Sequence, residues 1–269
     1  MIMSAPKRFS LLQRISTLIR WTMGFFFIAL VSVPYVFIVL LLLPWRGLRI
    51  RSGNLYGKLV GPAVTRITGT RARIGDRARL NEQKPAIYVT NHSSELDPFI
   101  AMWLCPVGGC GIAKKEIARV PFFGWAYKLS GHLLIDRSNR DRAIASMKEI
   151  ADLVNQYDLS IWIWPEGTRS RDGRLQPLKK GFVHLALATG LPIVPVIMHD
   201  AHERWPGRSL RMYPGQLNID ILPAVDTSGW SAETMEEHLT EIHGIFAEAL
   251  APHQKPSTDS KPARKRSLG

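Results

Sequence analysis

Residues 91–98, Asn91-His92-Ser93-Ser94-Glu95-Leu96-Asp97-Pro98, form the polar turn that decides the fold. The five residues before it are mostly apolar, with β-branched and aromatic side chains, which predicts a buried strand. Asp97 and Pro98 are typical of a helix start, and apolar residues 99–104 predict the helix body. His92 and Asp97 would point about 140° apart on one continuous helix. They can therefore meet only if the chain turns between them.

The overall composition favours a membrane protein over a nucleic-acid-binding protein. The chain has 269 residues, 46% of them hydrophobic, and a formal net charge of +13. That length is sufficient for one α/β domain with a sizeable core. Such a positive charge suits either nucleic acid or anionic lipid. Residues 21–45 carry no charged side chain and match the thickness of a bilayer, so we expect a phospholipid bilayer as partner and no nucleic acid.

Four segments follow from this pattern. Residues 1–20 are predicted to form an amphipathic interfacial segment, and residues 21–45 a membrane helix bounded by Trp21 and Trp45. Pro34 lies in the middle of that helix, and basic residues flank both ends, so a spanning and a re-entrant helix both stay open. Residues 46–251 form the α/β domain, and residues 252–269 a basic tail predicted to be disordered.

Strand and helix patterns alternate through the domain. Strand patterns cover residues 86–90, 131–137, 160–164, 192–197 and 217–222, and helical patterns cover residues 55–67, 97–104, 142–155, 182–189 and 231–250. This alternation predicts an α/β fold with a mostly parallel central sheet flanked by helices. Two prolines in 192–197 favour an edge position or a strand start. Ligands bind beyond the carboxyl ends of parallel strands, where we expect four side chains to converge: His92, Arg137, Glu166 and Arg169.

These residue types suit removal of a proton near a phosphate. A histidine held by a carboxylate can act as a general base on a hydroxyl. The chain has no Gly-x-Ser-x-Gly motif, so the hydroxyl is expected to belong to the substrate. Arg137 and Arg169 offer planar donors for phosphate oxygens, and Lys114 or Lys115 a further charge, although a surface salt bridge is the simpler interpretation of each residue taken singly. Glu166 could bind a polyol or pair with an arginine.

A metal site has little support in the sequence. The only two cysteines, Cys105 and Cys110, form one C-x4-C pair without a second pair or a nearby histidine. We therefore expect reduced thiols and no metal.

Four motifs occur in the order and spacing of the glycerolipid acyltransferase family, which this chain resembles: Asn91-His92-x4-Asp97, Gly131-x3-Ile135-x-Arg137, Pro165-Glu166-Gly167-Thr168-Arg169-Ser170 and Leu191-Pro192-Ile193-Val194-Pro195-Val196. The resemblance implies that His92 and Asp97 are the catalytic dyad. It also implies a set of residues that bind the phosphorylated glycerol: Lys115, Arg137, Glu166, Gly167, Thr168 and Arg169. Trp164 and Leu134 stand where the family usually has phenylalanine.

The resemblance further implies the reaction. The expected activity transfers an acyl group from acyl-CoA or acyl carrier protein to the free hydroxyl of lysophosphatidic acid, with no cofactor. The active domain is expected on the cytoplasmic face of a membrane, the bacterial inner membrane. Two alternatives stay open: another lyso-lipid acceptor, such as lyso-ornithine lipid or lysophosphatidylglycerol, and a catalytically silent membrane lipid-binding protein.

Overall fold

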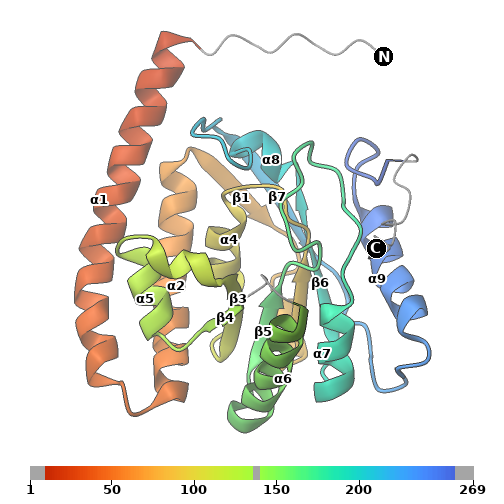
Figure 1. Cartoon of the computed structure of the whole chain (residues 1–269). Helices are drawn as coiled ribbons and strands as arrows, with labels where there is room; N and C mark the ends of the chain where they lie inside the picture. The colour runs from red at the N-terminus through yellow and green to blue at the C-terminus, as the bar shows by residue number, and fades with distance from the viewer. Residues whose placement is uncertain (1–9, 136–139, 258–269) are drawn as a thin grey trace, which may run out of the picture.

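A computed structural model describes residues 10–135 and 140–257 and confirms the α/β fold class (Figure 1). A seven-stranded sheet runs in the order β1-β7-β6-β2-β5-β3-β4, and every neighbouring pair is parallel except β6 and β7. The strands are β1 (Thr70–Ile74), β2 (Ile87–Thr90), β3 (Gly109–Lys114), β4 (Leu133–Ile135), β5 (Ser160–Ile163), β6 (Ile193–His199) and β7 (Gly215–Ile221).

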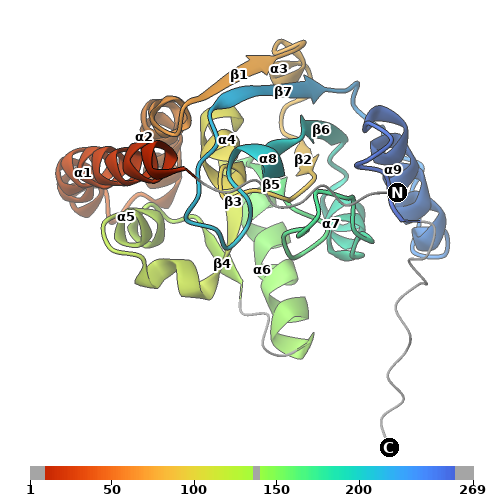
Figure 2. The ribbon, with the colours of Figure 1, turned by 90° about the horizontal axis from the view of Figure 1, so that it is seen from above.

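Helices cover both faces of this sheet (Figure 2). On one side lie α1 (Leu11–Leu41), α2 (Arg46–Ile67), α4 (Asp97–Leu104) and α5 (Phe123–Leu129). On the other side lie α6 (Arg140–Tyr157), α7 (Gly181–Thr189) and α9 (Met235–Ala249). Shorter helical segments are α3 (Arg79–Glu82), a 3₁₀ turn (Lys115–Arg119) and α8 (Ala201–Arg204).

The central strand β2 contributes to the cores on both faces of the sheet, because successive side chains of a strand point to opposite faces. Ile87 and Val89 pack with α6 and α7, whereas Tyr88 packs with α4 and stacks on Trp162 of β5 at 5.5 Å between ring centroids. All four residues of β2 are buried. The polar residues that follow β2 are therefore attached to the most rigid part of the sheet.

Strand β6 corrects the edge alternative, because it lies inside the sheet between β7 and β2. Pro192 directly precedes the strand, and Pro195 lies within it. The Leu222 N–H donates to the Pro195 carbonyl at 3.0 Å, so the backbone polar atoms of Pro195 face β7. The antiparallel ladder with β7 begins only at Val196. The missing N–H of Pro195 therefore lies at the end of that ladder, and its absence removes no bond from the paired region.

Two helix starts and two strands also differ from the sequence patterns. Helix α2 begins nine residues earlier than expected, at Arg46, and α9 begins at Met235 because Ser231 bonds to Thr234 in a preceding turn. Strands β1 and β3 were not predicted at all, and β1 carries two basic residues, Arg71 and Arg73.

The N-terminal helix α1 is continuous from Leu11 to Leu41, with Pro34 inside it. Ser10 and Gln13 form a capping box at its start. The interfacial and membrane segments expected from the sequence are thus parts of one helix, which ends before the expected boundary at residue 45. By length and composition, α1 is the one helix among the described residues that could cross a membrane.

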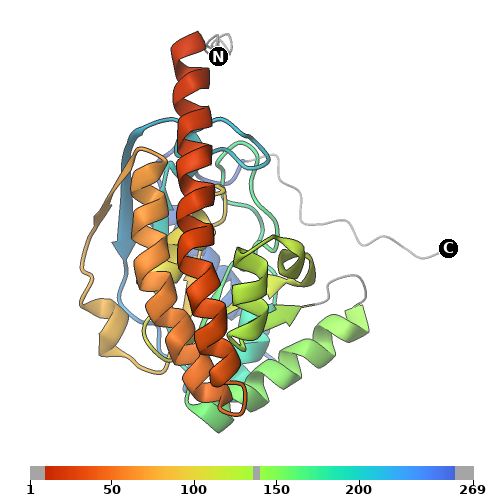
Figure 3. The same ribbon diagram turned by 90° about the vertical axis from the view of Figure 1, so that its left-hand side faces the viewer.

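Helices α1 and α2 lie side by side as a hairpin (Figure 3). Tyr35 and Tyr56 stack at 4.5 Å between ring centroids, and the Ser32 and Tyr56 hydroxyls share a hydrogen bond of 2.7 Å. The opposite flank of α1 exposes large apolar side chains, including Leu12, Phe26 and Leu41. Such a surface is expected where lipid replaces water as the neighbour.

Two glycines bring α2 into backbone contact with α4. Gly57 and Gly61 lie four residues apart and so share one face of α2. A Cβ at Gly61 would lie 2.4 Å from the Phe99 carbonyl oxygen, and one at Gly57 would lie 2.7 Å from the Met102 carbonyl oxygen. Because Asp97 is the first residue of α4, this close packing also holds the backbone of Asp97 in position.

We expect Gly61→Ala to lower the free energy of unfolding by about 1–3 kcal/mol, because the added methyl group overpacks the α2–α4 contact. The matched control is Gly244→Ala in α9, where a Cβ would meet nothing within 4 Å. That change should stabilise the fold by about 0.5–1 kcal/mol through helix propensity alone. Denaturant unfolding in detergent measures both. Equal effects of the two changes would contradict the packing described.

Candidate active site

His92 directly follows the end of β2 and is held beside Asp97 by the turn between them. Asn91 fixes the start of this turn: its side-chain amide donates to the Met198 carbonyl at 2.9 Å and accepts from the Met198 N–H at 2.8 Å. His92 Nδ1 lies 2.7 Å from Asp97 Oδ2. Asp97 is fully buried, whereas the His92 side chain keeps 13% of its surface exposed. The chain therefore turns between His92 and Asp97 and brings the two side chains into contact, as their spacing requires.

The Asp97 carboxylate uses one oxygen for three contacts. Besides the His92 ring, Oδ2 accepts from the Ser93 and Ser94 N–H groups, both at 2.8 Å. The other oxygen, Oδ1, is buried without a hydrogen-bond partner among the described residues. Asp97 therefore does not use one oxygen to cap the helix and the other to hold His92; a single oxygen binds both His92 and the turn. The helix begins at Asp97 itself, and the N–H groups that Asp97 binds belong to the turn.

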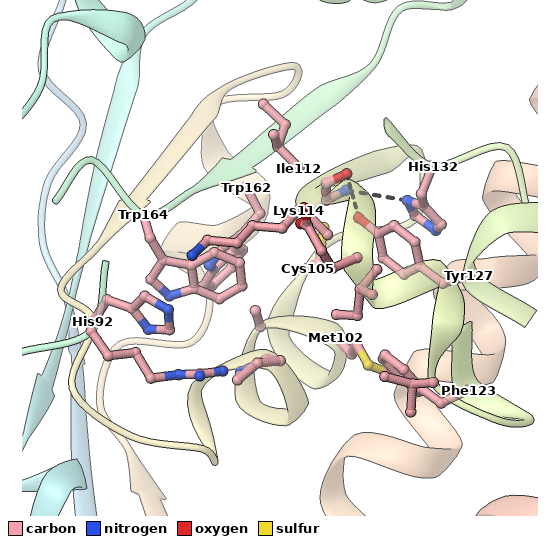
Figure 4. Close-up of a pocket in the computed structure, with 18 of the residues that line it drawn as sticks. His92, Met102, Cys105, Ile112, Lys114, Phe123, Tyr127, His132, Trp162 and Trp164 are labelled. Carbon is pink, nitrogen blue, oxygen red and sulfur yellow. Dashed lines mark hydrogen bonds between the residues drawn. The ribbon is translucent and has the colours of Figure 1, made fainter. Parts of the chain in front are cut away.

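This arrangement sets the tautomer of His92. A carboxylate oxygen that accepts two backbone N–H groups favours a third donor, so Nδ1 carries the proton and Nε2 is left as the basic nitrogen. His92 lines the main cavity, so this nitrogen is available to a substrate there. Trp164, which follows β5, stacks on the imidazole at 5.0 Å between ring centroids and restricts its rotation (Figure 4).

Glu166 binds the backbone of His92 and does not line the cavity. Its side chain is 2% exposed; Oε1 accepts from the His92 N–H at 2.6 Å, and Oε2 accepts from the Gln176 N–H at 3.0 Å. The Ser170 N–H donates to the His92 carbonyl at 2.8 Å, so both backbone groups of His92 bind this loop. Burial raises the pKa of Glu166 to about 8, and the two backbone N–H donors act against that rise.

The next three residues of the same loop line the cavity, as the sequence predicts for substrate-binding groups. Gly167 has φ +72°, and a Cβ there would lie 2.8 Å from Lys179 Nζ, so both backbone conformation and space favour glycine. Thr168 is exposed. Arg169 donates through Nε to the Ser94 carbonyl at 3.1 Å and through Nη1 to Glu95 Oε1 at 3.2 Å.

Two other predicted residues are not placed in the cavity wall. Lys115 is exposed at the start of the 3₁₀ turn, and its neighbour Lys114 lines the cavity instead. Arg137 lies outside the described residues. The structure adds two cavity-lining cations that the sequence did not single out, Arg171 and Arg208. No recognisable motif marks Arg208, so no signal in the sequence could have found it.

The cavity is about 470 Å³ in volume and changes character along its length. Near His92 its walls carry basic side chains such as Lys114, whereas further in they are largely apolar, with Met102, Ile112 and Phe123 among them (Figure 4). At the inner end the Tyr127 hydroxyl donates to the Gly111 carbonyl at 2.7 Å, and the Gly111 N–H donates to His132 Nδ1 at 3.2 Å. Burial lowers the pKa of His132 to about 4, so this end is uncharged at neutral pH.

Comparisons with known proteins agree with the motifs and the geometry. A family model described as Acyltransferase matches residues 71–199. The 1-acyl-sn-glycerol-3-phosphate acyltransferase of Limnanthes douglasii is 43% identical over 232 residues, which cover 86% of this chain and 82% of the relative. The protein of the same name from Escherichia coli (strain K12) is 33% identical over 180 residues, 67% of this chain and 73% of the relative.

The chain belongs to the 1-acyl-sn-glycerol-3-phosphate acyltransferase family. It is an acyltransferase, as the four motifs imply. The crystal structure of the 1-acyl-sn-glycerophosphate (LPA) acyltransferase PlsC from Thermotoga maritima matches it with a TM-score of 0.73, covering 87% of this chain and 92% of that one. At 21% sequence identity this match shows a shared fold.

The pKa of Glu166 predicts a pH-dependent stability. Because this pKa is raised from its ordinary 4.5 to about 8, the folded protein keeps a proton that the unfolded chain releases between these values. The stabilisation is therefore fully present below about pH 4.5 and is lost as the pH rises toward 8. Glu166→Gln cannot titrate. We expect wild-type stability minus variant stability, from denaturant midpoints, to fall between about pH 5 and 8; a constant or growing difference would contradict this account.

Proposed function

We propose that the enzyme transfers an acyl group from an acyl thioester to the free hydroxyl of 1-acyl-glycerol-3-phosphate, giving phosphatidic acid. One observation carries the proposal: the Asp97-bound imidazole of His92 lies where a basic cavity mouth meets an apolar interior. An acceptor with a phosphate and a donor with a hydrocarbon chain need these two environments on either side of the reacting atoms. The names of the relatives supply the choice of acceptor.

In the proposed step, His92 Nε2 removes the proton from the acceptor hydroxyl as its oxygen attacks the thioester carbonyl carbon. The new C–O bond forms, the C–S bond breaks, and the departing thiolate takes the proton back from the imidazolium. Asp97 stabilises the imidazolium through Nδ1–H and keeps the ring oriented. General base assistance of this kind supplies roughly 10²–10⁴-fold in rate. The step uses this dyad alone and no metal.

The acceptor phosphate is proposed to bind at the cavity mouth. Arg169 presents a planar guanidinium there, and Lys114 adds a compact positive charge. Gly167 and Thr168 form the adjacent wall. Arg137 and Lys115 stay predictions for the same role.

The donor's acyl chain is proposed to occupy the apolar interior. The volume of the cavity falls within the range of ordinary small-molecule sites, about 300–1,000 Å³. Because its inner end carries no charge, a hydrocarbon chain can enter without removing water from a charged group. Acyl-CoA and acyl carrier protein both present an acyl thioester, so both are proposed donors.

The bilayer is proposed to hold α1, with the active domain on the cytoplasmic face. An acceptor lipid would then reach the cavity mouth from the membrane surface without crossing bulk water. The exposed apolar flank of α1 supports this placement.

We expect His92→Ala to lower kcat by about 10²–10⁴-fold, because the general base is lost. The chain offers a matched control in His199, whose Nε2 lies 2.7 Å from Asp220 Oδ2 outside the cavity lining. His199→Ala removes an equivalent His–Asp pair and should leave kcat within about twofold. Initial rates in purified membranes, with a melting curve for each variant, provide the measurement. Near-normal turnover by His92→Ala would remove the dyad from the mechanism.

An acceptor panel tests the substrate. With radiolabelled acyl thioester, we expect turnover of lysophosphatidic acid to exceed that of lysophosphatidylglycerol and lyso-ornithine lipid, because a phosphomonoester carries the greatest negative charge to the basic mouth. A preference for either other lipid would replace the proposed acceptor. Absence of dyad-dependent turnover with all three would favour a lipid-binding role.

A further inference from the structure

The segment between α8 and β7 is bound directly to the dyad turn. The Trp205 carbonyl accepts from the Ser94 hydroxyl at 2.7 Å and from the Glu95 N–H at 3.0 Å. Two residues further on, Gly207 lies against the Arg169 side chain, where a Cβ would be 3.4 Å from Arg169 Cδ. Gly207 and Arg208 therefore reach the cavity mouth and share its wall with the Arg169 loop.

Glu95 binds two arginines at once through a single oxygen. Oε1 accepts from Arg169 Nη1 at 3.2 Å and from the backbone N–H of Arg208 at 2.8 Å. Arg208 has φ +61°, a conformation that is uncommon for residues other than glycine. Such conformations persist only where surrounding contacts determine them, and they cluster at functional sites. Glu95 supplies that contact here.

The two arginines differ in what their guanidinium groups contact. The Arg169 group is engaged by the Ser94 carbonyl and by Glu95. The Arg208 side chain is exposed, lines the cavity, and makes no hydrogen bond or ion pair to the part of the chain that the structure describes. Its planar set of donors therefore faces the cavity mouth in a form suited to a phosphate.

The same segment also contacts the helix that could enter the membrane. Trp21 of α1 donates through its indole N–H to the Leu210 carbonyl at 2.9 Å, and its ring meets Trp205 edge-on at 5.2 Å between centroids. A lipid that leaves the bilayer along α1 would meet residues 205–210 before reaching His92. This position favours the acceptor lipid over the thioester donor as the ligand of Arg208.

We propose that Arg208 is a further binding residue for the phosphate of the acceptor, and that Glu95 is the positioning residue that holds it at the cavity mouth. The assignment deepens the proposed function and rests on it. A phosphate also occurs in coenzyme A, so the test must measure the two substrates separately.

The test is steady-state kinetics of Arg208→Ala in non-ionic mixed micelles, with lysophosphatidic acid and acyl-CoA varied in turn. We expect the KM for lysophosphatidic acid to rise about 10- to 100-fold, the range for losing charge-assisted hydrogen bonds. The kcat and the KM for acyl-CoA should stay within about threefold. Arg208→Lys keeps the charge but loses the planar donors, so its KM should lie between those of wild type and Arg208→Ala.

Arg211→Ala is the matched control, because Arg211 is an exposed arginine of the same segment that does not line the cavity. It should leave all three constants unchanged. Glu95→Ala should also raise the acceptor KM, and it should raise it less in the Arg208→Ala background than in wild type, because the two residues act together.

Several outcomes would overturn the assignment: an unchanged acceptor KM in Arg208→Ala, an equal rise in Arg211→Ala, a rise in the acyl-CoA KM instead, or additive effects of Glu95→Ala and Arg208→Ala. Failure of the proposed function would be recognised separately. In that case the wild-type enzyme itself would not use lysophosphatidic acid.

Discussion

The site depends on one oxygen atom, Oδ2 of Asp97, which accepts from the Ser93 N–H, the Ser94 N–H and the His92 ring. These three contacts close the turn after β2, orient the imidazole and place its second nitrogen toward the cavity. The carboxylate is fully buried, so each of these bonds forms where water does not compete. A single acidic residue thereby joins the fold of the turn to the chemistry of the site.

The rest of the fold keeps this turn in place. Asn91 ties its start to β6, Glu166 holds the backbone N–H of His92, and Trp164 covers one face of the imidazole. From the opposite side, Gly61 allows α2 to pack against the backbone of α4. His92, the group proposed to be catalytic, therefore needs little reorganisation when substrate binds, which is how preorganised sites gain rate. Helix α1 reaches the same turn through Trp21 and the segment that carries Arg208.

Local sequence patterns predicted the scaffold well and the directions of side chains poorly. The buried strand before His92 and the alternation of strands with helices predicted the α/β fold. They also predicted that His92 and Arg169 lie at the same rim, and both line one cavity. The interior position of β6 was not predictable, because it depends on where the ladder with β7 begins relative to Pro195. Glu166 points toward the backbone of His92 and away from the cavity, and Lys114 lines the cavity where Lys115 does not. Both facts depend on backbone turns that a motif does not encode. Arg208 reaches the site through tertiary contacts alone.

The most direct test of this account is the kcat of Asp97→Asn with lysophosphatidic acid and acyl-CoA. The asparagine oxygen can still accept the two turn N–H groups, but its amide cannot stabilise an imidazolium. We therefore expect a protein that still folds but melts at a lower temperature, because the amide NH2 takes the partnerless position of Oδ1, and a kcat lower by about 10²–10⁴-fold. A folded Asp97→Asn enzyme with kcat within about threefold of wild type would contradict the central role of the carboxylate.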